Sequence, residues 1–162
     1  MKKLLKIDEL VAMSNQLHSQ GKKIVATSGC FDILHTGHVT YLAEAKSKGD
    51  VLAVMLNSDS SVRKLKGRER PIVNENERAT VISALGCVDY VCIFDEETPC
   101  GCYEKFKPDI IIKGGDYKGK HIPEIDVAAN YGGKVEYVSM VNGCSSTNII
   151  EKIKKLVGGQ RI

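Results

Sequence analysis

The sequence predicts a doubly wound α/β domain built on a five-stranded parallel sheet. Short apolar runs rich in β-branched residues alternate with helical patterns five times along the chain. The run over residues 51–56 is apolar at every position, as expected for a strand covered on both faces of a parallel sheet. A length of 162 residues suits one domain with a core of its own. We therefore expect a single domain over residues 1–162, with an N-terminal helix over 7–20 and a core over about 22–157.

The expected elements follow in order along the chain. Residues 7–20 form an amphipathic helix because apolar residues recur on one side, and Gly21 ends it. Residues 23–28 form the first strand, and residues 39–45 begin a helix that Gly49-Asp50 breaks. The later strands are expected over residues 51–56, 90–94, 109–113 and 134–139. The later helices are expected over residues 74–85, 98–106, 122–130 and 148–156, with a frayed tail from Gly158.

A glycine-bearing loop, residues 29–38, joins the first strand to the following helix. The first N–H groups of a helix lack intrahelical partners, and the helix dipole adds partial positive charge there, so this geometry suits an anion. Gly29 and Gly37 let the backbone approach a ligand closely. His35 and His38 lie one turn apart and can both donate hydrogen bonds to one phosphate. An ordinary turn with two surface histidines explains this combination less well.

A basic segment, residues 62–71, follows the strand at 51–56. Its closely spaced lysines and arginines could be an ordinary solvated surface. However, α/β proteins build their sites at the carboxyl ends of parallel strands, and Gly67 and Pro71 argue against a long helix. We therefore expect a basic loop over the active site, in which Lys66 reaches substrate phosphates while Arg68 and Arg70 stay mostly in solvent.

Two more segments follow predicted strand ends. Residues 114–119 form a glycine-rich loop that contains Asp116. Ser145, Ser146 and Thr147 place three hydroxyls at the start of the last helix, where they can cap the helix and also donate to phosphate oxygens. A plain N-cap for the hydroxyls and a plain turn residue for Asp116 are the alternatives.

Composition limits the kind of partner. The formal net charge of +3 fits a phosphate-bearing substrate, and the sequence has no long basic tract of the kind that binds nucleic acid. No apolar run approaches the ~20 residues of a membrane span, and residues 1–6 lack the features of a signal peptide. We expect a cytoplasmic protein that binds neither nucleic acid nor membrane.

Six cysteines raise the alternative of a metal or redox protein. Cys100 and Cys102 have the wrong spacing for a usual zinc knuckle, and no second pair accompanies them. We expect free thiols and no metal held by protein side chains. Cys30 and Cys144 fall in the glycine-bearing loops of the expected site, as small fillers that could react with alkylating agents.

Residues 29–38 resemble the Gly-x-Phe-Asp-x-x-His-x-Gly-His signature of the His-x-Gly-His nucleotidyltransferase superfamily. The resemblance implies a Rossmann-like nucleotidyltransferase fold and transfer of a nucleotidyl group from a nucleoside triphosphate to a phosphate-bearing acceptor. The run Ser145-Ser146-Thr147 resembles the superfamily's second motif, which holds the β and γ phosphates. Some members have an arginine a few residues upstream, where this chain has Met140-Val141-Asn142-Gly143. Lys66, Arg78 and Lys113 are the candidates for the replacing cation.

Within the superfamily, the chain is most similar to the heptose 1-phosphate nucleotidyltransferases of bacterial cell-surface sugar synthesis. The similarity rests on residues 65–67, 113–118 and 143–150, and it covers about residues 20–156. In several such proteins this domain is fused to a sugar kinase, and we expect the present chain to be the transferase domain alone. The resemblance implies adenylyl transfer to a sugar 1-phosphate, with ATP or another nucleoside triphosphate as donor.

The resemblance also implies roles for particular residues. His35 and His38 meet the charge that develops on the α-phosphate. From its place in the basic segment, we expect Lys66 to complete the catalytic set. The nucleotide is expected to contact Lys113, Asp116 and residues of the two motifs, which are Gly29, Cys30, Phe31, Gly37, Ser145, Ser146 and Thr147. Asp32, Lys66 and Arg78 are expected to bind the acceptor substrate. Mg²⁺ would accompany the triphosphate with few protein ligands.

The sequence is also compatible with two other functions. A glycerol 3-phosphate cytidylyltransferase, or one acting on a similar alcohol phosphate, would use the same fold. A non-catalytic nucleotide-binding protein would not need both histidines. The base, the sugar and the oligomeric state, including a homodimer, are left open by the sequence.

Overall fold

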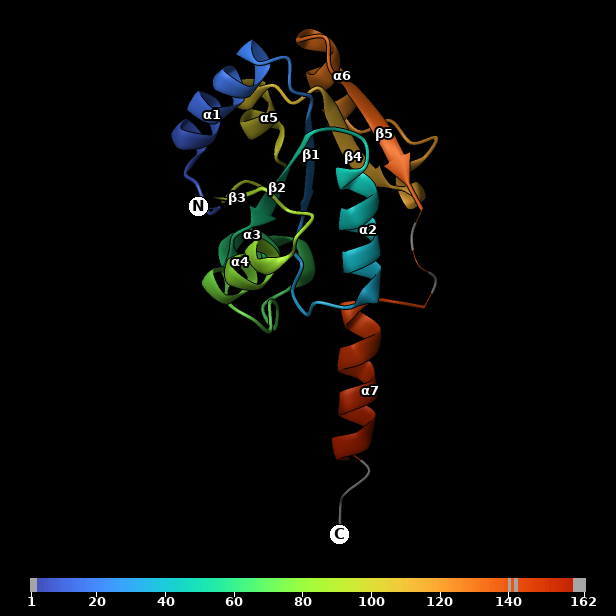
Figure 1. The fold of residues 1–162 in the computed structure, drawn as a ribbon. Helices are drawn as coiled ribbons and strands as arrows, with labels where there is room; N and C mark the ends of the chain where they lie inside the picture. The colour runs from blue at the N-terminus through green and yellow to red at the C-terminus, as the bar shows by residue number, and fades with distance from the viewer. Residues whose placement is uncertain (1–2, 140, 142, 159–162) are drawn as a thin grey trace.

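The computed structural model describes residues 3–139, 141 and 143–158. Its centre is one parallel sheet of five strands in the order β3-β2-β1-β4-β5 (Figure 1), which confirms the predicted fold class. The strands are β1 (Ile24–Gly29), β2 (Val51–Asn57), β3 (Tyr90–Phe94), β4 (Ile110–Gly114) and β5 (Lys134–Val138). The chain runs outward from β1 to β3 and then returns to the other side of β1. The strand order therefore reverses between β1 and β4, where doubly wound sheets bind their ligands.

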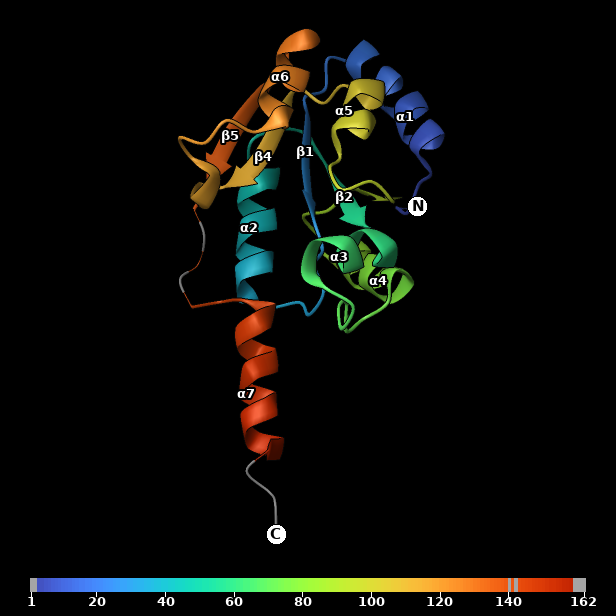
Figure 2. The same ribbon diagram turned by 180° about the vertical axis from the view of Figure 1, so that it is seen from behind.

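Helices cover both faces of the sheet (Figures 1 and 2). One face is covered by α1 (Ile7–Ser19), α5 (Cys100–Phe106) and α6 (Pro123–Asn130), which pack on Ile24, Ala26, Met55 and Ile111. The other is covered by α2 (Thr36–Lys46) and α4 (Glu75–Ala84), which pack on the alternate strand residues Val25, Leu52, Val54 and Ile112. Successive strand side chains point to opposite faces, so uniformly apolar strands fill both layers.

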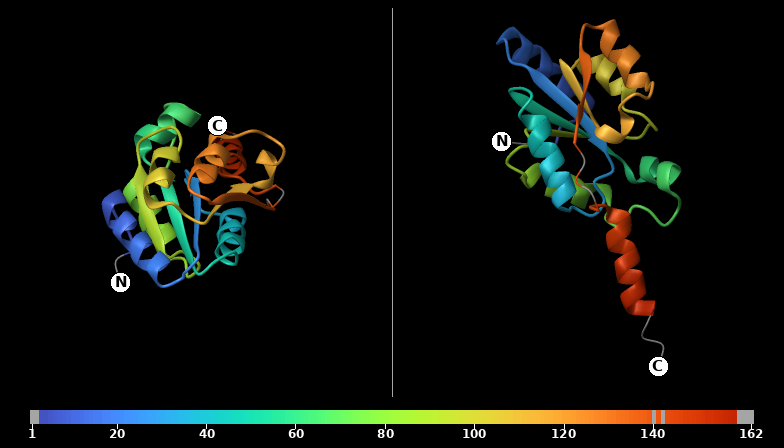
Figure 3. Two further views of the ribbon diagram at one scale, coloured as in Figure 1. Left: turned by 90° about the horizontal axis from the view of Figure 1, so that it is seen from above. Right: turned by 90° about the vertical axis from the view of Figure 1, so that its right-hand side faces the viewer.

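Two helices lie outside these layers. The short helix α3 (Asp59–Lys66) follows the carboxyl end of β2. The last helix, α7 (Ser146–Gly158), begins beside the α2 entrance and extends away from the body (Figure 3). Its residues Ile153, Leu156 and Val157 are exposed.

The structure corrects several predicted boundaries. The basic segment is helical up to Lys66, because Ser58 caps α3 by accepting a hydrogen bond from the Ser61 backbone at 3.2 Å, and Gly67 ends the helix with φ of 93°. Only residues 67–73 form the loop. Helix α2 begins at Thr36 rather than Val39, and α7 begins at Ser146 rather than Asn148. The predicted frayed tail begins at Gly158, which the structure makes the last residue of α7, and its other residues, 159–162, lie outside the described residues, as do Met140 and Asn142.

Candidate active site

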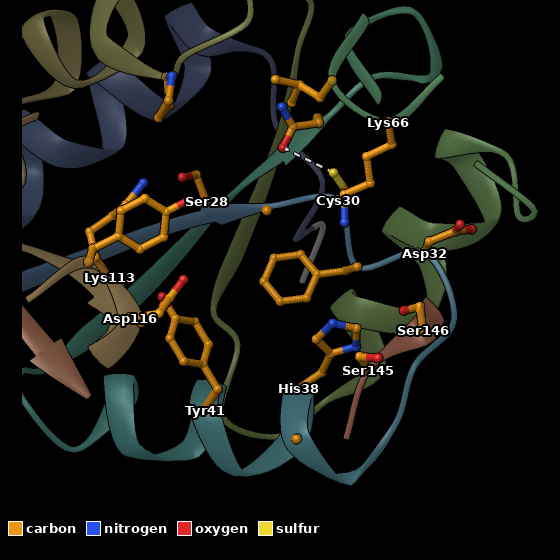
Figure 4. Close-up of a pocket in the computed structure, with 18 of the residues that line it drawn as sticks. Ser28, Cys30, Asp32, His38, Tyr41, Lys66, Lys113, Asp116, Ser145 and Ser146 are labelled. Carbon is orange, nitrogen blue, oxygen red and sulfur yellow. Dashed lines mark hydrogen bonds between the residues drawn. The ribbon is translucent and has the colours of Figure 1, made fainter. Parts of the chain in front are cut away.

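A pocket of about 620 Å³ opens at the carboxyl ends of β1, β2 and β4, at the predicted switch point. This volume lies in the usual range for small-molecule sites. Figure 4 shows His38 with Ser145 and Ser146 at one side and Lys113 with Asp116 at the other. Of the predicted site residues, all but Arg78 line the pocket; these are Gly29, Cys30, Phe31, Asp32, His35, Gly37, His38, Lys66, Lys113, Asp116, Ser145, Ser146 and Thr147.

The two signature histidines face one another at the entrance of α2. Their rings stack with centroids 3.8 Å apart, and the edge of Phe31 packs against His38 at 5.1 Å. Phe31 has φ of 44°, an uncommon conformation for a residue with a side chain, and its ring lies where a Cβ on Gly29 would come within 2.9 Å. The glycine and the strained phenylalanine therefore fix the place of His38.

Both imidazoles are neutral at physiological pH. Burial lowers the pKa of His35. Burial, repulsion from a protonated His35 and the charge of Lys66 lower the pKa of His38 to about 4. The Nδ1 atom of His35 is buried and has no hydrogen-bond partner among the described residues. A neutral imidazole donates one hydrogen bond, and an arriving phosphate would favour the charged form as well.

The start of α7 completes this side of the pocket. Ser145 Oγ accepts a hydrogen bond from the Asn148 backbone at 3.0 Å. Ser145 is therefore the N-cap of α7, the alternative role expected from the sequence for these hydroxyls. Ser146 Oγ donates to the Ile33 carbonyl at 3.3 Å, which ties α7 to the signature loop. Gly37 allows this approach, because a Cβ there would come within 3.0 Å of Cys144 Cβ and of the His35 ring.

The structure gives Asp32 a different task from the predicted binding of substrate hydroxyls. Its carboxylate is buried and accepts hydrogen bonds from Arg70 Nε at 2.6 Å, from the Ile72 backbone at 2.8 Å and from the Val73 backbone at 2.9 Å. Burial alone would raise the pKa of Asp32, but these hydrogen bonds outweigh it and hold that pKa below the usual value. Asp32 therefore anchors the loop 67–73 to the signature.

The same contact corrects the expectation for Arg70. Its side chain is only 12% exposed and lines the pocket instead of standing in solvent. Arg68, by contrast, is exposed as predicted. No feature of the sequence separates these two arginines, because only the position of Asp32 in the fold decides between them.

Arg78 is not among the residues that line the pocket. Its side chain is fully buried, and it donates to Asp59 Oδ1 at 2.7 Å and to the carbonyls of Cys30, Asn57 and Val73 at 2.6, 2.8 and 2.9 Å. The predicted role is therefore wrong. Arg78 instead joins α4 to the carboxyl ends of β1 and β2, which is the floor under the signature.

Lys113 is held by a carboxylate that sequence reasoning did not single out. Its Nζ lies 2.8 Å from Glu124 Oε1, and both side chains are nearly buried, with 13% and 5% exposure. The ammonium also lies over the Tyr117 ring, 4.8 Å from its centre. Lys113 is thus neutralised by Glu124 and is a poor candidate for the missing phosphate cation. The exposed Asp116 lies next to this unit.

The remaining wall carries Lys66 and further polar side chains. Lys66 is the last residue of α3 and is exposed, and its positive charge acts on both His38 and Cys30. Burial raises the pKa of the Cys30 thiol, whose Sγ lies 3.9 Å from Asn57 Oδ1. Glu97 and Thr98 also line the pocket and were missed, although their position after β3 is a usual place for site residues.

The described residues contain neither a cluster of metal ligands nor a membrane-spanning helix. No three His, Cys, Asp or Glu side chains gather there in a way that could hold a metal ion. Within the same part of the chain, no helix is long and apolar enough to cross a membrane. The six cysteines are free thiols.

Stacked neutral histidines and a helix start bearing hydroxyls meet in one pocket at the switch point, an arrangement that suits anionic groups such as phosphates. Residues 26–152 match the Cytidylyltransferase-like family, and the chain belongs to that family. The nucleotidyltransferase class predicted from the signature is confirmed by this match.

Curated relatives agree over almost the whole chain. The chain is 52% identical over 156 residues to a bifunctional protein HldE from Geobacter metallireducens, with 96% of this chain and 32% of the relative covered. It is 50% identical over 148 residues to a bifunctional protein HldE from Aliarcobacter butzleri, with 91% and 30% covered. The chain spans about a third of the length of the curated relatives it matches.

Solved structures agree as well. A lipopolysaccharide core biosynthesis protein from Thermoplasma volcanium is 36% identical, with a TM-score of 0.61 over 75% of this chain and 98% of that one. A pantoate-beta-alanine ligase from Francisella tularensis, solved with β-γ ATP and β-alanine, has a TM-score of 0.65 over 98% of this chain and 80% of its own. At 15% identity, the second likeness shows the fold alone.

Proposed function

We propose that the chain transfers an adenylyl group from ATP to heptose 1-phosphate, giving ADP-heptose and pyrophosphate for cell-surface polysaccharide synthesis. The observation that carries this proposal is the stacked His35–His38 pair next to the start of α7, with Lys66 lining the same pocket. Such a site offers hydrogen-bond donors both to the triphosphate of the nucleotide and to the phosphate of the acceptor. The resemblance of residues 65–67 and 113–118 to heptose 1-phosphate nucleotidyltransferases supports the choice of acceptor.

In the proposed reaction an oxygen of the acceptor phosphate attacks the α-phosphorus of ATP. A new P–O bond forms, the bond from the α-phosphorus to the bridging oxygen breaks, and pyrophosphate leaves with that electron pair. The nucleophile is already ionised, so the protein positions the reactants and stabilises charge. His35 and His38 donate hydrogen bonds where charge grows on the α-phosphate and the bridging oxygen.

The other predicted residues divide between the two substrates. The α7 start, with Ser145, Ser146 and Thr147, holds the β and γ phosphates. Asp116 accepts a hydrogen bond from a ribose hydroxyl, and Lys66 meets the acceptor phosphate. Mg²⁺, when bound, neutralises charge on the triphosphate; with no protein cage among the described residues, it would be held through the phosphates and water.

One panel tests the proposed function. Pyrophosphate release is measured with ATP, CTP and GTP, each against heptose 1-phosphate and glycerol 3-phosphate. Rapid release only with ATP and heptose 1-phosphate is expected. Release with CTP and glycerol 3-phosphate would establish the alternative cytidylyltransferase. No release in any well, with ATP still bound, would leave a non-catalytic nucleotide-binding protein.

The reaction draws on a nucleoside triphosphate, so we place it in the cytoplasm.

A homodimer is proposed on the apolar stripe of α7, where Ile153, Leu156 and Val157 recur at helical spacing and stand exposed. Such a stripe suits pairing with the same stripe of a second copy. Light scattering should give twice the chain mass, and Ile153→Asp with Leu156→Asp should halve it. A monomer before substitution would refute the dimer.

A further inference from the structure

We propose that Arg70 binds the pyrophosphate end of the nucleoside triphosphate and so replaces the arginine that this chain lacks upstream of Ser145. The inference rests on the proposed nucleotidyl transfer for its reaction, but it concerns the leaving group alone. It is carried by three contacts that place Arg70 against the α7 start and by a guanidinium nitrogen that the protein leaves unused.

The first contact fixes the arginine. Asp32 Oδ2 accepts from Arg70 Nε at 2.6 Å, and the backbone N–H groups of Ile72 and Val73 bind the same carboxylate. The guanidinium is therefore held at one edge, with little rotamer freedom left. A donor fixed in advance binds an anion without the entropy cost of ordering a long side chain.

The second contact places the α7 start beside this arginine. Asp32 holds Arg70, and the next residue, Ile33, accepts the Ser146 hydroxyl through its carbonyl at 3.3 Å. Arg70 and the proposed site for the β and γ phosphates are thus bound to two consecutive residues, Asp32 and Ile33. A third contact agrees: Glu69 lies 3.7 Å from Lys154 of α7. That exposed pair adds little stability, but it places the loop next to the helix.

The unused nitrogen completes the case. Arg70 Nη2 is buried and has no hydrogen-bond partner in the described part of the chain, although its residue lines the pocket. A buried charged donor without an acceptor is costly, so such a group calls for an anion. Arginine matches phosphate oxygens with paired donors. Of the three candidates from the sequence, Lys113 is bound by Glu124, Arg78 lies under the floor of the pocket, and Lys66 is assigned to the acceptor phosphate.

The test measures the affinity of inorganic pyrophosphate by titration calorimetry, with AMP as the comparison probe. Arg70→Ala should weaken pyrophosphate ~10-fold or more, as expected for loss of a hydrogen bond between charged groups, and leave AMP within ~2-fold. Arg68→Ala is the matched control from the same loop, because Arg68 is exposed, and it should change neither affinity. Unchanged pyrophosphate affinity in Arg70→Ala, or equal losses for pyrophosphate and AMP, would overturn the inference.

Arg70→Lys keeps the test decisive if Arg70→Ala does not fold. A lysine retains the charge but has only one nitrogen. It therefore cannot donate to Asp32 and to pyrophosphate from two separate edges, as a guanidinium can. Weaker pyrophosphate binding is again expected, and wild-type binding would refute the role. The outcome is separate from that of the proposed function: a chain that binds pyrophosphate through Arg70 but never modifies heptose 1-phosphate would refute only the proposed acceptor.

Discussion

The imidazole rings of His35 and His38 lie 3.8 Å apart with their planes inclined by only 22°. Two rings stacked so closely cannot both take up a proton without strong repulsion. Burial also lowers the pKa of each ring, so both stay neutral at physiological pH, and the negative charge of a bound triphosphate would favour protonation.

Replacing either histidine should remove one donor to the reacting phosphate. We expect His35→Ala and His38→Ala each to lower kcat by ~10²-fold or more, the size of effect seen when one transition-state donor is lost. His121→Ala is the matched control, because that side chain is 73% exposed and lies outside the pocket lining. Steady-state kinetics decide the matter, and near wild-type kcat in both pocket variants would refute the assignment.

The lowered pKa of His38 predicts an acid-sensitive fold. The unfolded imidazole titrates near 6.5, whereas the folded one titrates at about 4. Between these values the unfolded state binds a proton that the folded state does not. The free energy of unfolding should therefore fall as pH drops from about 6.5 to about 4. Urea titrations at several pH values give the free energy of unfolding as a function of pH. This free energy should change less steeply with pH in His38→Asn than in wild type, and the same pH dependence in both would contradict the prediction.

Arg78 should matter for stability more than for binding. Arg78→Ala leaves three backbone carbonyls and Asp59 without their donor, and removing one partner of such a buried network costs ~3–5 kcal/mol. Arg63→Ala is the control, because it removes an exposed arginine from α3. Chemical denaturation should separate the two variants. A loss below ~1 kcal/mol in Arg78→Ala would show that the network is dispensable.

Lys66 is expected to act on the acceptor. Lys66→Ala should raise the KM for the sugar phosphate ~10-fold, because one charge-assisted contact is lost, and it should change the KM for ATP much less. Lys64→Ala removes a neighbouring exposed lysine of the same helix and should leave both values unchanged. Equal, mild effects of the two substitutions would mean that the end of α3 is an ordinary solvated surface.

Much of the fold could be predicted because its strands are buried on both faces. Uniform apolar runs such as residues 51–56 have no other economical interpretation in a chain of this length. Helix α3 was missed because its sequence is mostly polar or charged, and its stability depends on the Ser58 cap and on Val62, which is fully buried. A cap and one anchoring side chain leave too weak a periodic signal over eight residues.

The site was predictable where it is local in sequence and not where it depends on long-range pairs. Residues 29–38 and 145–147 each carry a loop-to-helix pattern that can be read directly. The roles of Asp32 and Arg78 could not be read, because their partners lie 38–41 and 5–48 residues away along the chain. The same holds for Glu124, which acts on the site only through its ion pair with Lys113.

The hydrogen bond between Ser146 and Ile33 joins two segments that are 113 residues apart. Chains are synthesised from the N-terminus, so the histidines leave the ribosome long before the helix that faces them. A nascent chain therefore carries the signature without the α7 start that completes the proposed phosphate site. Until α7 emerges, it should be unable to trap a triphosphate and should leave the cellular nucleotide pool untouched.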